Sequence, residues 1–206
     1  MNAKVIALLL LALGLLVYLY APRNSADGRA HEFDSDSTEC VANLRAIYDG
    51  LLSYVEENGR PPEGSGVAFF AELVASGHWP NDEEHARRLT CPGVALSELG
   101  LAGKPANEWF ASLDGLDGTS SGYAGRDQAG WPVATLPSTR TEPLVACDNA
   151  TGANHADVTN VLMGDGSILS LELENEIANG NVPEGTERFV VGPDADLPEL
   201  SKLSLD

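Results

Sequence analysis

The sequence NHADVTNVLMGDGSIL, residues 154–169, contains the strongest local signal for the fold. Residues 159–163 and 167–173 are interpreted as two strands, and Gly164-Asp165-Gly166 lies between them. An Asp-Gly pair is typical of hairpin turns, because a tight turn needs residues that tolerate a positive φ. The sequence therefore predicts an antiparallel hairpin that turns at Asp165 and Gly166.

His155 lies just before the first predicted strand, and nine residues separate it from Asp165. A strand rises by about 3.3 Å per residue, so the two side chains are expected roughly 15 Å or more apart, at opposite ends of the strand. Groups that far apart do not share a metal ion. We therefore interpret His155, Asp165 and Gly166 as structural residues, and expect His155 to hydrogen-bond a neighbouring loop or backbone group.

A long amphipathic helix is predicted upstream, over residues 38–57. Its apolar residues recur at steps of three and four, the spacing of one helix face: Val41, Leu44, Ile47, Tyr48, Leu51, Leu52 and Val55. Gly50 lies inside this pattern and lowers helix propensity by about 1 kcal/mol relative to alanine. Its presence indicates a close packing contact at that position.

Signals for both ends of this helix are present. Ser37 is expected to be the N-cap, and Gly59 followed by Pro61-Pro62 is expected to end the helix, because proline cannot continue it. A second, shorter helix is predicted over residues 67–80. Residues 93–153 have poor periodicity and many turn residues, so turns and short irregular strands are expected there.

The pattern as a whole predicts an α+β fold in which the long helix packs on a small antiparallel sheet. We divide the chain into a membrane anchor (1–22), a small, polar, acidic spacer (23–37), the folded domain (38–173) and an acidic carboxy-terminal extension (174–206). The extension is expected to add a strand and a small helix that dock on the domain. Binding of a partner by this extension is the alternative.

The anchor is predicted from an unbroken apolar run over residues 5–21. At 1.5 Å per residue it reaches about 25 Å, close to the short limit for a helix that spans a bilayer. Tyr18 and Tyr20 suit the membrane interface, whereas a signal-peptide cleavage site favours small residues. We expect an uncleaved signal anchor with residues 23–206 outside the cytoplasm. A secreted or periplasmic protein released by cleavage is the alternative.

The charge balance excludes one class of partner. The chain has 12 Lys and Arg against 31 Asp and Glu, a formal net charge of −19. Nucleic-acid affinity is built from cationic side chains, so no nucleic-acid partner is expected. Such a surface attracts cations, and the weak candidates for calcium ligands are Asp148, Asn149, Asn154 and Asp157. A solvated acidic loop is the simpler explanation, because no Asp-x-Asp-x-Asp-Gly pattern is present, and no cofactor is predicted.

Three cysteines, Cys40, Cys91 and Cys147, are widely separated in the sequence. Zinc sites usually show closely spaced ligand pairs, so the sequence predicts no metal site. Outside the cytoplasm one pair of cysteines can form a disulfide. We expect Cys91 with Cys147, because both lie in loop-like sequence whereas Cys40 falls on a helix face.

These motifs together resemble a known family. The spacing of His155 and Asp165-Gly166 is similar to the H-x9-DG carboxy-terminal motif of pseudopilin-like proteins of planctomycete and verrucomicrobial bacteria, which are related to type II secretion pseudopilins. The resemblance covers residues 38–173. Its further elements are Cys40 to Ile47, Tyr54, Asn58-Gly59, Pro61-Pro62, Cys91-Pro92-Gly93 and Ser121-Gly122-Tyr123. The prepilin cleavage and methylation motif of such proteins is absent. The glutamate that helps to register subunits in a fibre is absent too.

The resemblance implies a non-catalytic structural or interaction protein, anchored by a single pass in the bacterial inner membrane with its domain in the periplasm. It further implies protein partners or self-association, and a link to a type II secretion or pilus-like apparatus. One alternative is a periplasmic hydrolase or metal-dependent enzyme that uses His155 with Asp148, Asp157 and Asp165, or His78 and His85; no HExxH or GxSxG motif accompanies them. A calcium-binding module is the other alternative.

Overall fold

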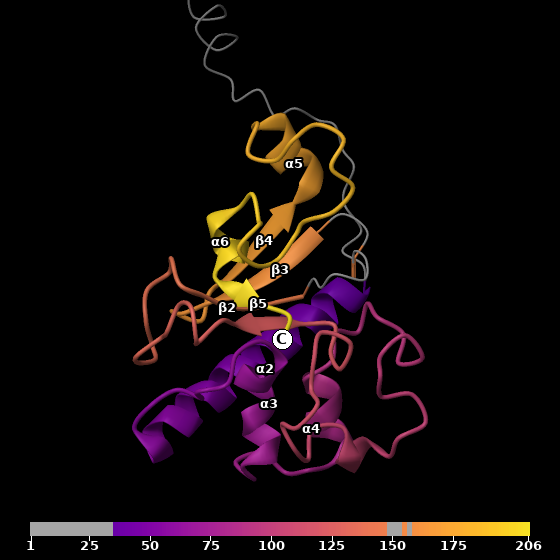
Figure 1. The fold of residues 1–206 in the computed structure, drawn as a ribbon, viewed down its shortest axis with the longest axis vertical. Helices are drawn as coiled ribbons and strands as arrows, with labels where there is room; N and C mark the ends of the chain where they lie inside the picture. Colours follow the sequence, from indigo (N-terminus) through magenta and orange to yellow (C-terminus); the bar gives the residue numbers. More distant parts are fainter. Residues whose placement is uncertain (1–34, 148–153, 156–157) are drawn as a thin grey trace, which may run out of the picture. The chain divides into compact units, whose positions relative to one another are not determined.

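A five-stranded antiparallel sheet forms the centre of the fold (Figure 1). The computed structural model describes residues 35–147, 154–155 and 158–206. The strands lie in the order β4-β3-β2-β1-β5. Their bounds are β1 Ala124–Arg126, β2 Pro143–Ala146, β3 Val158–Met163, β4 Ile168–Glu172 and β5 Leu203–Ser204. The predicted α+β class with a helix on an antiparallel sheet is confirmed.

The hairpin of β3 and β4 turns where the sequence predicts it. Leu162 pairs with Ile168, and the N–H of Met163 donates to the carbonyl of Ser167 at 2.9 Å. Gly166 has a φ of 83°, so the loop is a three-residue turn that needs glycine at its last position. Asp165 accepts hydrogen bonds from the backbone N–H and the hydroxyl of Ser167, at 3.0 and 2.6 Å. The Asp-Gly pair therefore serves the turn itself.

The long predicted helix is α2, Ser35–Asn58. Its buried side comprises Cys40, Leu44, Ile47, Tyr48, Leu51 and Tyr54. Gly50 provides the expected close contact, because a Cβ there would lie 2.5 Å from the ring of Trp79. Gly59 ends the helix with a φ of 74° and an N–H that donates to Val55 at 2.8 Å.

Ser37 is not the N-cap of this helix, which corrects the sequence prediction. It lies inside α2 and is 1% exposed. Its hydroxyl accepts a hydrogen bond from the side chain of Asn160 in β3, at 3.2 Å. The hydroxyl oxygen of Ser37 therefore accepts from a side chain that is distant in the sequence, and not from a backbone N–H of the first helical turn.

Two further helices lie beside α2, α3 Val67–Ala75 and α4 Glu83–Arg88, followed by the short helix η1 Ala106–Glu108. The predicted second helix is confirmed, although it ends at residue 75, ahead of Gly77 with its φ of 78°. The irregular segment 93–153 supplies β1 and β2 in addition to its turns.

The carboxy-terminal tail covers the other face of the sheet. It contains α5 Leu173–Ala178, α6 Pro198–Ser201 and β5, which pairs with β1 (Figure 1). Five tail residues are buried with Val161 and Met163 of β3: Val182, Phe189, Leu197, Leu200 and Leu203. Leu162, which lies between those two strand residues, packs instead in the core on the side of α2. The expected docking of the tail is confirmed, and both faces of the sheet are buried.

A buried ion pair helps to fasten this tail. Arg126 of β1 is 2% exposed and donates to Glu142 at 2.6 Å, and also to the carbonyls of Trp131 and Pro143 at 2.6 and 2.9 Å. Glu142 forms a second ion pair with Lys202, in which Oε1 of Glu142 lies 3.0 Å from Nζ of Lys202. Burial alone would raise the pKa of Glu142, but Lys202 and Arg126 outweigh it, so the pKa lies below its usual value of 4.5.

Within the described ranges no helix combines the length and the apolar character that crossing a membrane requires. The predicted membrane anchor, residues 1–22, and the spacer up to residue 34 lie outside those ranges.

Replacing Gly166 by alanine should destabilise the fold by two effects. The left-handed backbone costs about 1–2 kcal/mol for a residue with a side chain, and the new Cβ would lie 2.5 Å from the ring of Tyr48. Gly180→Ala is the matched control, since Gly180 has a φ of 75° and a Cβ there would meet no atom within 4 Å. We expect the free energy of unfolding from urea denaturation to fall clearly more for Gly166→Ala. Equal losses would show that the contact with Tyr48 contributes nothing.

Glu142→Gln should lower stability at neutral pH by about 1.5–3 kcal/mol, because the hydrogen bonds of a buried charge lose their charged partner. The native pKa of Glu142 is lowered, so its contribution is present above pH 4.5 and is lost as the pH falls through the native pKa. Thermal unfolding at pH 7 and pH 3 measures this. The two proteins should differ at pH 7 and differ less at pH 3, whereas the exposed Glu98→Gln should match the unchanged protein at both.

Candidate functional site

Four residues that are far apart in the sequence meet in the interior beside the first turns of α2. Cys40 belongs to α2, Cys91 lies in the loop after α4, Cys147 follows β2, and His155 precedes β3. Cys40 and Cys147 are fully buried, Cys91 is 1% exposed and His155 is 4% exposed. We call these four residues the Cys/His cluster.

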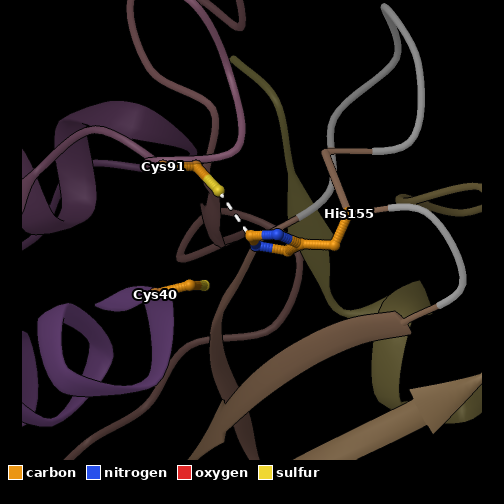
Figure 2. Close-up of side chains that lie close together, drawn as sticks. All are labelled: Cys40, Cys91 and His155. Carbon is orange, nitrogen blue, oxygen red and sulfur yellow. Dashed lines mark hydrogen bonds between the residues drawn. The ribbon is translucent and has the colours of Figure 1, made fainter. Parts of the chain in front are cut away.

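The reactive atoms of the Cys/His cluster are close together. Figure 2 shows the sulfurs of Cys40 and Cys91 pointing toward the ring of His155. The Sγ of Cys91 lies 3.4 Å from Nε2 of His155, and these two residues and Cys40 offer ligand atoms that all lie within 4.8 Å of one another. Cys147 packs in the same buried core as Cys40 and Cys91, and its sulfur accepts the backbone N–H of Asn160 at 3.0 Å.

Two glycines let the surrounding loops approach one another. A Cβ on Gly93 would come within 2.9 Å of Cε1 of His155 and would collide with the backbone of Asn154. A Cβ on Gly122 would lie 2.6 Å from Cβ of Cys91. Larger residues at either position would separate Cys91 from His155.

Hydrogen bonds between the loops maintain the same arrangement. The side-chain amide of Asn154 donates to the carbonyls of Gly122 and Cys147, which joins the loop before β3 to the loops that precede β1 and follow β2. The hydroxyl of Ser121 donates to the carbonyl of Leu89 at 2.6 Å, next to Cys91. The Cys-Pro-Gly and Ser-Gly-Tyr elements and the histidine of the H-x9-DG motif therefore converge on one place.

The surroundings shift the pKa values of the three cysteines in opposite directions. Side-chain hydrogen bonds from Cys147 and Cys91 hold the pKa of Cys40 below its usual value of 9.0. Burial raises the pKa of Cys91 and of Cys147.

Among the residues that the structure describes, two buried polar atoms beside the cluster have no hydrogen-bond partner: Nδ1 of His155 and the hydroxyl of Tyr123. Tyr123 is fully buried, and its pKa is raised by burial first and then by the charge of Cys40. An unsatisfied buried polar group costs about 1–3 kcal/mol, and such groups are rare in folded proteins. Both atoms are therefore open to a partner that is not among the described residues.

The predicted disulfide between Cys91 and Cys147 is not formed in this structure, in which all three cysteines are free thiols. The reasoning that placed Cys40 apart from the other two also fails. Cys40 is indeed on a helix face, but that face turns inward and brings its sulfur to the other cysteines and to His155. Separation in the sequence was therefore a poor guide to distance.

Among the described residues, the remaining candidates do not assemble into a second site. His155 meets a neighbouring loop at Cys91, as expected, while Asp165 is engaged in its own turn. His78 pairs with Glu57 at 3.1 Å, and His85 pairs with Asp82 at 2.8 Å.

The calcium candidates are only partly within the described ranges. Asn154 is buried, and its amide nitrogen donates to two carbonyls. Asp148, Asn149 and Asp157 lie outside the described residues.

Comparison of the chain with protein-family models, with curated proteins and with solved structures finds no match.

We expect all three cysteines to be reduced and protected in the folded protein. Burial should prevent alkylation of Cys40, Cys91 and Cys147 under native conditions, whereas denaturation without reductant should expose three alkylatable thiols. Intact-mass measurement before and after denaturation counts them, with a fully reduced sample as the control. Alkylation of a single thiol in the denatured, unreduced sample would show instead that two cysteines are bridged.

Proposed function

We propose that the chain is a membrane-anchored, extracytoplasmic structural or interaction protein of pseudopilin-like design, without catalytic activity. Residues 5–21 would anchor it in the bacterial inner membrane, and the folded domain would lie in the periplasm. Its partners would be other copies of the chain or proteins of a type II secretion or pilus-like apparatus. The apolar run in the sequence and the order of motifs over residues 38–173 support this proposal.

One observation supports the scaffold role above all others. Both ends of the H-x9-DG motif contact the same helix, α2. His155 lies beside Cys40 at one end, and at the other Gly166 lies against the ring of Tyr48, whose hydroxyl donates to the carbonyl of Gly164 at 3.2 Å. The motif residues therefore hold strand β3 against the helix. A residue that is buried for this purpose is not available to a substrate in solution.

The hydrogen bonds of Asn160 point to the same role. This fully buried side chain of β3 donates to Ser37 of α2 and accepts from Ser170 of β4 at 2.7 Å. Buried polar groups that are satisfied in this way favour one register between helix and sheet. The polar residues of the region thus support a rigid interface, as an interaction module requires.

Membrane anchoring is tested with the full chain expressed in a Gram-negative bacterium and detected with an antiserum. We expect the protein to stay in the membrane pellet after carbonate extraction and to be digested by protease added to spheroplasts. A variant with Leu10→Arg and Leu13→Arg is the control, since each arginine costs about 2.5–3.5 kcal/mol at the centre of a membrane helix. This variant should lose the membrane association. Release of the unchanged chain by carbonate, cleavage after residue 21, or protection from protease would each contradict the proposal.

The interaction role is tested by a photo-crosslinking residue placed on the exposed side of α2, at Ala42 or Ser53. The opposite side of α2 is buried, so these positions report what approaches the helix from outside. We expect discrete adducts in intact cells that contain a second copy of the chain or a secretion-apparatus protein. The absence of any adduct from both positions, with the domain folded, would argue against an interaction through this helix.

A further inference from the structure

We propose that Cys40, Cys91, Cys147 and His155 bind one zinc ion in a closed, tetrahedral, structural site. This inference goes beyond the proposed function, since it concerns what stabilises the domain and is independent of where the domain is located. It rests on the geometry of the Cys/His cluster, on the unsatisfied hydroxyl beside it and on the chemistry of its donors.

The distance between Cys91 and His155 is that of two ligands in a tetrahedral site. Zinc binds sulfur at about 2.3 Å and imidazole nitrogen at about 2.0–2.1 Å, so a sulfur and a nitrogen that share the ion lie roughly 3.5 Å apart. The Sγ of Cys91 and Nε2 of His155 are 3.4 Å apart. The ligand atoms of Cys40, Cys91 and His155 all lie within 4.8 Å of one another, so small side-chain rotations bring each of them to a common ion.

We assign Cys147 as the fourth ligand. It is fully buried in the same core as Cys40 and Cys91, but its sulfur lies outside the group of three whose ligand atoms are all within 4.8 Å, so it would have to turn toward the ion. The backbone N–H of Asn160 donates to this sulfur at 3.0 Å. Such a bond stabilises a thiolate and orients it, which is the task of residues that surround a metal ligand.

The donor set selects the ion. Thiolates and imidazole bind zinc well, and three cysteines with one histidine form a common structural zinc site. On binding, each cysteine exchanges its proton, released to solvent, for a bond to the metal. Zinc contributes +2 and three thiolates contribute −3, which leaves the site with a charge of −1. The ion is enclosed by residues that are at most 4% exposed, so no position remains for water or substrate.

One unsatisfied atom beside the cluster suits such a site. Among the described residues the buried hydroxyl of Tyr123 has no hydrogen-bond partner, so it can donate to a negatively charged, metal-bound sulfur. Nε2 of His155, 3.4 Å from the sulfur of Cys91, would bind the ion and leave the ring proton on Nδ1. Nδ1 has no partner among the described residues, and the ion does not supply one.

The zinc content of the full chain, purified in detergent without chelator, tests the proposal directly. We expect about one zinc ion per chain by elemental analysis. After removal by a chelator, the melting temperature should fall, because binding free energy at such a site is folding free energy. Added cobalt should restore stability and produce the sulfur-to-cobalt charge-transfer absorption of a tetrahedral thiolate site.

Four substitutions, one of them a control, separate ligation from general stability. Cys40→Ser and Cys147→Ser should each weaken zinc binding by more than about 100-fold, beyond the 10–100-fold typical of residues that only surround a metal site. Tyr123→Phe should weaken it by roughly 10-fold without destabilising the metal-free protein, since it removes an unsatisfied hydroxyl. Leu44→Ala is the matched control: Leu44 is buried on α2 one turn beyond Cys40, so this variant should be less stable but should keep its zinc.

Three outcomes would overturn the proposal. The first is a folded wild-type chain with three reduced thiols that holds no zinc and gives no cobalt charge-transfer band. The second is a disulfide between any two of the three cysteines in the purified chain. The third is equal loss of metal from Leu44→Ala and Cys40→Ser in folded protein. None of these results bears on membrane anchoring or on partners, so failure of the zinc proposal is distinguishable from failure of the proposed function.

Discussion

The fold depends on the crossing of α2 over strand β3. The helix has a continuous apolar side that must be covered, and β3 covers it while being attached at both of its ends. One attachment is the contact of Gly166 with Tyr48. The other is at His155, whose ring nitrogen lies within 4.8 Å of the sulfur of Cys40. Between them Asn160 hydrogen-bonds Ser37 in the helix. With these contacts in place, the helix has one position on the sheet, and the loops that carry Cys91 and Cys147 are positioned against it.

The same strand determines the second layer. Side chains of a strand alternate between the two faces of the sheet, so Leu162 packs toward α2 while Val161 and Met163 face the other way. Those residues would be exposed without the carboxy-terminal tail. The tail adds β5 beside β1 and covers them with apolar residues, and Lys202 and Arg126 share Glu142 at its edge. The acidic tail is thus part of the folded domain, because its apolar residues are buried against the sheet.

The features that the sequence predicted well are those coded by near neighbours. The turn at Gly166 and the end of α2 at Gly59 each follow from a few adjacent residues, and the periodic stripe from Leu44 to Leu51 reports the buried face directly.

The N-cap prediction for Ser37 was wrong because a residue of β3 competes for its hydroxyl. Strand β1 spans only Ala124–Arg126, too few residues for a periodic signal. The Cys/His cluster was missed because its members come from four segments, and nothing in their spacing encodes a distance in space. The one local hint was that Cys40 continues the apolar face that contains Leu44.

The way in which α2 is held at its beginning has a mechanical consequence. Any load transmitted along the chain from upstream enters the domain at the first turns of this helix. Those turns contain Ser37, bonded to Asn160, and Cys40, packed among the other cysteines and His155. A pulling force would therefore have to break the hydrogen bond between Ser37 and Asn160 and separate the Cys/His cluster before the helix could detach from the sheet. The polar contact and the Cys/His cluster are thus located at the end of the helix where tension would arrive.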